Sequence, residues 1–287
     1  MQHSDPSQSG TPEGPLQQIE WLVDALTREP EAWALFLDID GTLVDIAPSP
    51  DAIVVPPDLP GNLVALSRRL NGALALVTGR ALPYADKLFK PYELPVAGLH
   101  GAERRMVDGS VDAVAATSAF EEVKTALAAA AGQWPGVLVE DKGAAVAAHY
   151  RQAPEWRDEV EKAMEFYLLQ AGSDFTLQRG KMVFEIRPAR ANKGSAVQSY
   201  LEEATFRGRR PIAIGDDVTD EDMFRIVNRM GGHSIRIADA PGGTEARGII
   251  ASAEDLRQAL ARAATAGDGS EFPSSTSLPS SLKGRTA

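Results

Sequence analysis

The sequence contains no cysteine, which excludes disulfide bonds and thiol catalysis and fits a reducing compartment. It also lacks any run of about 18 apolar residues, so no segment is expected to cross a membrane. The N-terminal stretch MQHSDPSQSGTPEGP has no basic region followed by an apolar one, so it does not resemble a secretory signal. We therefore expect a cytoplasmic protein.

Positive charge is scarce. Lys and Arg number 29 against 40 Asp and Glu, which gives a formal net charge of −11. A general affinity for nucleic acid or for an anionic membrane is therefore not expected. An anionic small molecule could still bind, but only beside a local cluster of cations or a metal ion.

Two polar, low-complexity segments flank a globular region. Residues 1–15 and 266–287 are rich in Ser, Pro and Gly and are expected to be disordered. Between them, short apolar runs alternate with helical patterns, which indicates a parallel sheet covered by helices on both faces. The sequence predicts a helix over 63–70 and core strands over 34–39, 73–80, 96–101, 211–217 and 234–238.

The middle of the chain follows another pattern, in which helices alternate with hairpins. Helix, hairpin, helix, hairpin is typical of an antiparallel sheet with helices on one face. We therefore predict an α/β core over 16–107 and 189–265, interrupted by an inserted α+β domain over 108–188. The elements predicted in the insert are helices over 120–131 and 154–170 and strands over 137–140, 144–151, 174–178 and 182–187.

Two acids, Asp38 and Asp40, end the apolar stretch in FLDIDGTLVDI. Residues i and i+2 of a strand face the same side, and at the carboxyl end of a central strand that side borders the ligand crevice of open α/β sheets. Two carboxylates so close repel each other, which raises the pKa of one unless a cation neutralises them. The pair indicates a bound metal, an acid/base partnership, or both; the alternative is an ordinary Asp-Gly turn.

A hydroxyl and a cation also fall at the edge of the predicted core. Thr78 and Gly79 follow the strand ALALV, and glycine lets backbone amides approach an anion closely. Lys193 precedes a predicted helix, where a cation opposes the helix dipole unless it points at an anion. The alternatives are an ordinary strand-to-helix turn and a solvated lysine. The apolar face predicted for that helix comprises Ala196, Val197, Tyr200 and Leu201.

The segment IGDDVTDEDMF, residues 214–224, ends another apolar strand with a cluster of acids. Thr219 followed by Asp222 is typical of a capping box, which would explain part of this acid. Asp216 and Asp217 precede that cap and are left unexplained by it. An oxygen-rich site at a strand end suits Mg²⁺.

Taken in order, the motifs DIDGT, VTGR, the Lys193 segment and GDDVTD resemble the four signatures of the haloacid dehalogenase (HAD) superfamily of phosphotransferases. The long gap between the second and third motifs holds the insert, as in members with a type C2 cap. The stretches VEDKGAAVAAHYR, GKMVFEIRPARANKG and GLHG resemble trehalose-6-phosphate phosphatases. The resemblance implies a Rossmann-like HAD core with a parallel sheet and an inserted α+β cap domain.

The resemblance implies a Mg²⁺-dependent phosphatase that hydrolyses trehalose 6-phosphate to trehalose and phosphate through an aspartyl-phosphate intermediate. Asp38 would be the nucleophile, and Asp40 would be the general acid and base. Thr78 and Lys193 would hold the phosphoryl oxygens. The predicted metal ligands are Asp38, Asp40 through its backbone carbonyl, Asp216 and Asp217, with Asp220 and water as alternatives to Asp217.

The cap is expected to select the sugar. In MVFEIR, Phe184 and Ile186 can pack on the cap helices, which leaves Glu185 on the other face of its strand, over the crevice. Carboxylates accept hydrogen bonds from sugar hydroxyls, and a lysine donates them. The alternative is a solvated sheet face with ordinary cross-strand ion pairs. The predicted substrate-binding residues are Gly79, Arg80, His100, Gly101, Glu140, Lys142, Glu185 and Asn192.

Several alternatives stay open at the level of sequence. The closest are phosphatases of sucrose phosphate or mannosyl-3-phosphoglycerate, and a phosphomannomutase, which combines a similar acid pair with a cap. A non-catalytic sugar-phosphate sensor would belong to another functional class. The resemblance further implies functional coupling to a trehalose-6-phosphate synthase.

Overall fold

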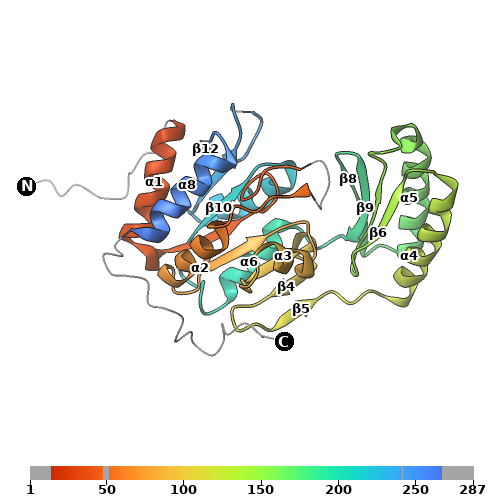
Figure 1. Cartoon of the computed structure of the whole chain (residues 1–287). Coiled ribbons are helices and arrows are strands. Elements are labelled where there is room, and N and C mark those ends of the chain that lie inside the picture. Colours follow the sequence, from red (N-terminus) through yellow and green to blue (C-terminus); the bar gives the residue numbers. More distant parts are fainter. Residues whose placement is uncertain (1–13, 48–51, 241, 267–287) are drawn as a thin grey trace, which may run out of the picture.

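The computed structural model describes residues 14–47, 52–240 and 242–266, which form two β-sheets with their helices (Figure 1). The segments predicted to be disordered, 1–15 and 266–287, lie almost wholly outside these residues. Among the described helices, none combines the length and apolar character needed to span a membrane. Short 3₁₀ helices are η1 (Pro30–Ala32), η3 (Leu99–Gly101), η4 (Ala131–Gln133), η5 (Pro154–Trp156) and η6 (Val218–Asp220).

The larger sheet has eight strands in the order β12-β11-β10-β1-β2-β3-β4-β5. The six strands from β12 to β3 pair in parallel, and β4 and β5 are antiparallel additions at one edge. The predicted parallel core is thereby confirmed. The strands of the larger sheet are β1 (Trp33–Leu37), β2 (Leu74–Val77), β3 (Val96–Gly98), β4 (Glu103–Arg105), β5 (Val111–Ala113), β10 (Arg210–Gly215), β11 (His233–Ile237) and β12 (Gly248–Ile250).

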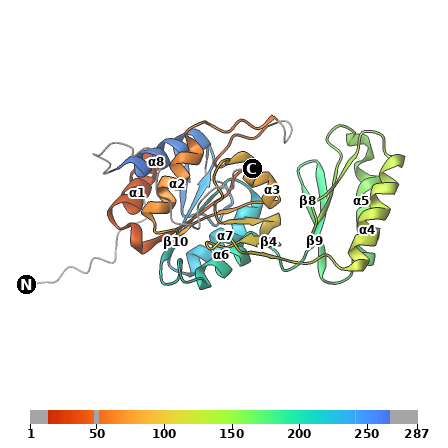
Figure 2. The ribbon, with the colours of Figure 1, turned by 60° about the horizontal axis from the view of Figure 1, so that its bottom comes forward.

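Helices cover both faces of this sheet, so every residue of β1 and β2 is buried. On one face α8 packs against α1 and α2, and on the other α6 packs against α7 (Figure 2). The apolar face predicted for α6 is buried as expected. The helices are α1 (Pro15–Arg28), α2 (Leu59–Arg69), α3 (Leu82–Leu88), α6 (Lys193–Glu202), α7 (Glu221–Arg229) and α8 (Ala253–Thr265).

The order of the strands creates a switch point between β1 and β10. From β1 the chain builds β2 and β3 on one side, and it later returns to place β10 on the other side. In open α/β sheets a ligand crevice forms outside the carboxyl ends of the strands at such a point. The N–H of Asp38 donates to the carbonyl of Ile214 at 3.0 Å, so the segments that leave β1 and β10 start side by side.

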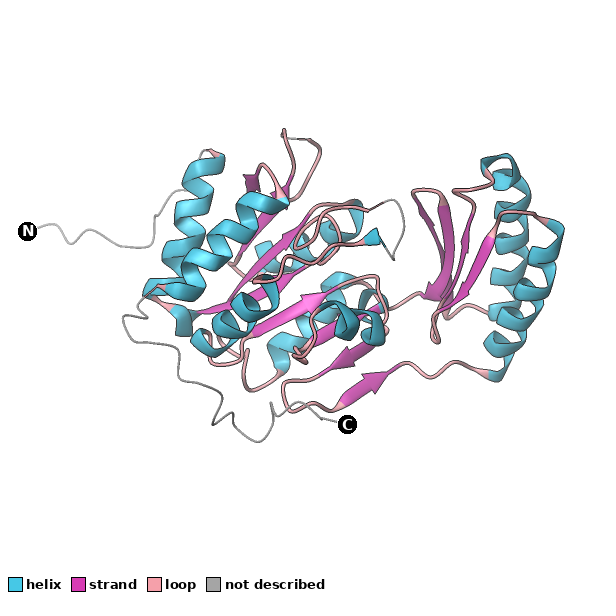
Figure 3. Cartoon of the chain, in the orientation of Figure 1, coloured by secondary structure: helices cyan, strands magenta, loops and turns pink. Residues whose placement is uncertain are grey.

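The smaller sheet is antiparallel, with the strand order β6-β7-β9-β8. Helices α4 (Ser118–Ala130) and α5 (Arg157–Ala171) cover its outer face, and its other face is turned toward the core (Figures 1 and 3). Phe184 and Ile186 are buried in the cluster that includes residues of both helices, as the alternation in MVFEIR predicts. The strands are β6 (Leu138–Asp141), β7 (Val146–His149), β8 (Phe175–Gly180) and β9 (Val183–Pro188).

Residue 108, where the insert is predicted to begin, lies between β4 and β5 of the larger sheet. Strand β5 (Val111–Ala113) pairs with β4 and so continues the larger sheet. All three residues of β5 are exposed, which explains why its composition does not mark it as a core strand. We therefore propose that the cap spans 118–188, from α4 to the end of β9.

Candidate active site

Lys193 lies buried between two carboxylates at the switch point. Its Nζ donates to Asp38 Oδ1 at 2.7 Å and to Asp220 Oδ1 at 2.6 Å. The side chains of Lys193, Asp38 and Asp220 are 3%, 5% and 0% exposed, which excludes the alternative of a solvated lysine. Lys193 is held there because it begins α6, where the N-cap Asn192 accepts a hydrogen bond from the Ser195 N–H.

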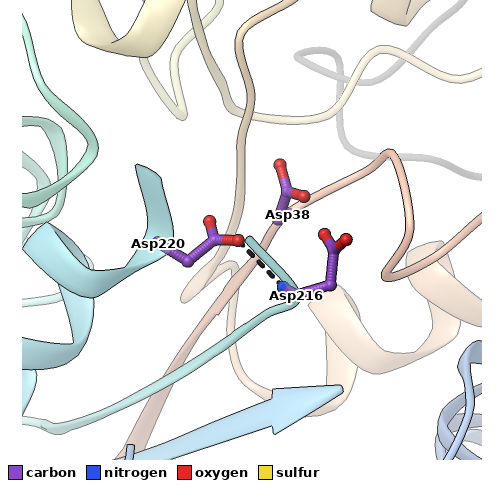
Figure 4. Close-up of side chains that lie close together, drawn as sticks. All are labelled: Asp38, Asp216 and Asp220. Carbon is purple, nitrogen blue, oxygen red and sulfur yellow. Dashed lines mark hydrogen bonds between the residues drawn. The ribbon is translucent and has the colours of Figure 1, made fainter. Parts of the chain in front are cut away.

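Three carboxylates converge beside Lys193. One oxygen from each of Asp38, Asp216 and Asp220 lies within 4.8 Å of the others (Figure 4). Gly41 makes this approach possible, because a Cβ at residue 41 would lie 2.2 Å from Asp216 Oδ2, and its φ of +81° also favours glycine. A set of carboxylate oxygens at a strand end is the donor set that Mg²⁺ prefers, so these residues fit that ion.

Burial dominates the electrostatics of this cluster. Burial raises the pKa of Asp38 well above its usual value; Lys193 opposes the shift, and the charges of Asp220 and Asp216 add to it. Burial, together with Asp220 and Asp217, raises the pKa of Asp216 to about 7. For Lys193, burial acts to lower the pKa, but the charges of Asp220 and Asp38 outweigh it and raise the pKa. When all three acids are ionised, the cluster holds more negative charge than one lysine neutralises, and either protons or a further cation offset the excess.

Asp40 does not take part in this crowding, contrary to the expectation that Asp38 and Asp40 repel each other. The Asp40 carboxylate accepts two hydrogen bonds from Arg80, at 2.8 Å from Nε and 2.9 Å from Nη2. Both side chains are about 30% exposed, at 29% and 30%. The negative charges that act on Asp38 thus come from the segment after β10, and Asp40 stands at the wall of the crevice.

The Asp217 side chain caps η6 and is not in the converging cluster. Its Oδ1 accepts from the Thr219 N–H at 2.7 Å and from Thr219 Oγ1 at 2.6 Å. Asp220 Oδ2 in turn accepts from the N–H groups of Asp216 and Asp217. The capping box predicted at Thr219 and Asp222 is therefore wrong, because the box is formed by Asp217 and Asp220. The structure brings Asp220 to the other acids in place of Asp217.

His100 borders the crevice, whereas Thr78, whose carbonyl accepts from the His100 N–H at 2.9 Å, is not among the residues that line it. Thr78 is fully buried at the end of β2, and its Oγ1 accepts from the Arg80 N–H at 3.1 Å. The His100 ring packs against Gly79, where a Cβ would lie 2.7 Å from Nε2. Burial lowers the pKa of His100 well below its usual value, and the charge of Lys193 adds to this effect. His100 is therefore a neutral imidazole at pH 7.

On the cap, three charged residues face the core. Lys142 Nζ donates to Glu185 Oε2 at 2.6 Å, and their side chains are only 13% and 9% exposed. Glu140 Oε2 lies 2.9 Å from His149 Nε2, and this hydrogen bond lowers the pKa of Glu140. Glu185 Oε1 is buried and has no hydrogen-bond partner among the described residues. A buried carboxylate oxygen without a donor is costly.

The core and cap residues line one crevice. A cavity of about 550 Å³ reaches Asp38 and Lys193 from the core and Glu140, Lys142 and Glu185 from the cap. An adjoining cavity of about 740 Å³ includes Asp216 and Asn192. Arg80 and His100 border both cavities, and Gly79 borders the cavity of about 550 Å³. Within the described part of the chain, Gly101 borders neither; it packs instead against α6, where a Cβ would lie 3.2 Å from the Asn192 carbonyl.

Residues 36–252 match the family model described as trehalose-phosphatase. The chain belongs to the trehalose-phosphatase family. It is 60% identical over 242 residues to a probable trehalose-phosphate phosphatase of Sinorhizobium fredii, covering 84% of this chain and 91% of the relative. It is 41% identical over 239 residues to trehalose-6-phosphate phosphatase of Escherichia coli K12, covering 82% and 89%.

The fold agrees with this family. The C-terminal domain of Candida albicans trehalose-6-phosphate phosphatase superimposes with a TM-score of 0.72 at 22% sequence identity, covering 86% of this chain and 96% of that one. The predicted HAD-type α/β core with an added α+β sheet is thereby confirmed.

This trehalose-phosphatase family member has further residues in its site to which the sequence analysis assigned no role. Thr42 Oγ1 donates to Asp216 Oδ1 at 3.4 Å, which places the threonine of DIDGT inside the acid cluster. His149, Arg151 and Lys181 border the cavity from the cap. Alternation along β7 could have marked His149, whereas no local pattern distinguishes Arg151 and Lys181 from solvated cations.

Proposed function

We propose that this chain hydrolyses trehalose 6-phosphate to trehalose and phosphate. The observation that carries the proposal is one cavity that joins the buried Asp38–Lys193 pair to Glu140, Lys142 and Glu185 on the cap. Carboxylates accept hydrogen bonds from sugar hydroxyls, and a phosphoryl group fits beside a buried ammonium. Membership of the trehalose-phosphatase family and the names of the relatives select the sugar.

Asp38 is the nucleophile in this proposal. Its carboxylate oxygen attacks phosphorus, the bond from phosphorus to the sugar oxygen breaks, and an aspartyl-phosphate forms. Asp40 protonates the departing sugar oxygen and later takes a proton from the water that hydrolyses the intermediate. Both Asp40 oxygens accept hydrogen bonds from Arg80 in this structure, so the role requires that this ion pair opens when the substrate binds. Lys193 already contacts Asp38, so its ammonium can hold a phosphoryl oxygen as that group moves onto Asp38. Thr78 would hold a second phosphoryl oxygen, which requires that its buried hydroxyl becomes accessible to the substrate.

Asp38, Asp216 and Asp220 are the residues that would hold Mg²⁺, together with the backbone carbonyl of Asp40. When bound, the ion would offset the repulsion between a phosphate dianion and these carboxylates. The chain itself provides the preorganised oxygens, because Thr42 and the η6 turn fix the acids before any ligand arrives.

The cap residues select the sugar. Glu140 and Glu185 accept hydrogen bonds from sugar hydroxyls, and Lys142 donates one while it holds Glu185 in place. We place the reaction in the cytoplasm, downstream of a trehalose-6-phosphate synthase that supplies the substrate. Fractionation of cells that express the protein would test the location, and co-purification would test a physical association with the synthase.

The decisive experiment is a panel of phosphate esters assayed for released phosphate, with and without Mg²⁺. The panel contains trehalose 6-phosphate, sucrose 6-phosphate, mannosyl-3-phosphoglycerate, mannose 1-phosphate and p-nitrophenyl phosphate. We expect the highest kcat/KM with trehalose 6-phosphate and loss of turnover when Mg²⁺ is chelated. A higher kcat/KM with another ester, conversion of mannose 1-phosphate without phosphate release, or no turnover at all would contradict the proposal.

A further inference from the structure

Lys124 of α4 is a buried lysine that borders neither cavity of the crevice. Its side chain is only 7% exposed. The Nζ donates to Asp141 Oδ1 at 3.0 Å and to the Gly143 carbonyl at 3.1 Å, and it pairs with Glu121 at 2.8 Å. Lys124 therefore connects the helical layer of the cap to the turn between β6 and β7.

That turn has a defined geometry. Asp141 Oδ1 accepts from the Gly143 N–H at 2.8 Å as well as from Lys124. Gly143 has a φ of +80°, which an L side chain rarely adopts. The N–H of Lys142 donates to the Ala145 carbonyl at 3.0 Å and closes the turn. Lys124 thus contacts both ends of the segment 141–143, which is already closed by its own hydrogen bonds.

Lys142 is the middle residue of this turn, and its side chain borders the cavity. Its ammonium contacts Glu185 Oε2 on β9, and Glu140 lies two residues earlier on the same hairpin. A flexible hairpin tip would let this buried pair separate, because a long lysine side chain has many rotamers. Recognition groups need a fixed supporting shell to keep their geometry. Burying the ammonium of Lys124 carries a desolvation cost that an apolar residue would avoid. What the lysine contributes to the cap is therefore its three polar contacts.

We propose that Lys124 is a positioning residue for sugar recognition. It fixes the Asp141–Gly143 turn, so that Lys142 and Glu185 keep one arrangement toward the sugar. The inference rests on the proposed function, in which Lys142 and Glu185 contact trehalose 6-phosphate. Lys124 itself touches neither the substrate nor the reacting atoms.

The test compares two substrates in the full chain. Lys124→Met keeps the length and apolar stem of the side chain but removes the ammonium. We expect its kcat/KM for trehalose 6-phosphate to fall about tenfold more than its kcat/KM for p-nitrophenyl phosphate, mainly through KM. Lys162→Met, which removes an exposed lysine from α5, is the matched control and should change the ratio by less than about twofold. Lys124→Arg should restore most of the preference. Equal losses on both substrates, or no loss, would overturn the proposal.

A double variant shows whether Lys124 acts through Lys142. If it does, Lys124→Met/Lys142→Met has the same substrate preference as Lys142→Met alone. A further fall by the full factor of Lys124→Met means that the two residues act independently, and the proposal is wrong. If Lys124→Met does not fold, Asp141→Ala removes the acceptor of the Lys124 ammonium together with that of the Gly143 N–H, and should give a selective loss at least as large. An unchanged preference in that variant would also overturn the proposal.

Failure of the proposed function has a different signature. In that case the wild-type chain shows no preference for trehalose 6-phosphate, or Lys142→Met loses equally on both substrates, and both proposals are wrong. If Lys142→Met loses selectively and Lys124→Met does not, the sugar-reading role of the cap stands and only the role of Lys124 fails.

Discussion

Replacing Lys193 by Met should destabilise the metal-free protein strongly and in a pH-dependent manner. The substitution removes the ammonium that contacts both Asp38 and Asp220 and retains a side chain of similar length. Two buried carboxylates then face each other and Asp216 without a contacting cation. The prediction concerns folding free energy, so it is independent of the catalytic role proposed for Lys193.

The magnitude follows from burial. Removing one partner of a buried ion pair typically costs about 3–5 kcal/mol, because the remaining charge stays uncompensated. Neither carboxylate is more than 5% exposed, so water compensates little of the loss. Proton uptake by Asp38 limits the loss of stability, because burial already raises the pKa of this carboxyl well above its usual value. We therefore expect a loss of about 3–4 kcal/mol at pH 7.5, rather than the sum of two broken pairs.

The sign of the pH dependence is fixed by the raised pKa. A carboxyl whose pKa is higher in the folded than in the unfolded state binds its proton more tightly when folded. Its protonation therefore stabilises the fold as the pH falls below the folded pKa, by up to about 1.4 kcal/mol for each pH unit. The deficit of Lys193→Met should shrink between pH 8 and pH 5. Saturating Mg²⁺ should also recover more stability in the variant than in the wild type, because it restores positive charge.

Urea unfolding followed by tryptophan fluorescence, in EDTA and in Mg²⁺, measures these free energies. Lys162→Met is the control for loss of a lysine on the surface and should lie within about 0.5 kcal/mol of the wild type. Equal stability of Lys193→Met and wild type at pH 7.5 in EDTA would refute the reasoning. So would a deficit that grows as the pH falls.

Four other changes test the site and the core. Asp38→Asn should abolish phosphate release while the thermal unfolding transition is retained; wild-type release would contradict its role as nucleophile. Glu140→Ala should lower kcat/KM about tenfold more for trehalose 6-phosphate than for p-nitrophenyl phosphate, and equal losses would exclude sugar reading by this residue. Gly41→Ala should weaken Mg²⁺ binding at least about tenfold in calorimetric titration, because a Cβ there overlaps Asp216; unchanged affinity would exclude Asp216 as a ligand. Burial lowers the pKa of His233 from 6.5 to about 4, so protonation favours the unfolded state and stability should fall by up to about 3 kcal/mol as the pH drops through this range. His233→Gln should show a flatter decline in urea unfolding at pH 4 to 7, and parallel curves for both proteins would refute this account.

Local sequence patterns predicted many strands and the face on which their side chains lie, because these features depend on neighbours along the chain. Apolar runs identified β1, β2 and β10, since a strand covered on both faces must be apolar at nearly every residue. Alternation in MVFEIR placed Phe184 and Ile186 toward the cap helices and Glu185 toward the crevice. The order of the four motifs along the chain indicated the superfamily before any distance was known.

The edges and registers were harder to predict. Strand β5 is short and exposed, so nothing in its composition assigns it to the larger sheet. In IGDDVTDEDMF, two pairs of residues have the spacing of a capping box, and only the backbone of η6 decides that Asp217 and Asp220 form it. That choice determines which acid joins Asp38 and Asp216.

Patterns along the chain were enough to predict most of the parallel strands and the residues that carry chemistry, and the order of the motifs implied the kind of reaction. The tertiary structure alone decided which groups meet: Lys193 lies between Asp38 and Asp220, and Asp40 is held by Arg80. Lys193 and Asp38 stand 155 residues apart in the chain, so no local pattern relates them. Charge interactions and desolvation depend on distance and burial in space, and these exist only once the segments have packed together.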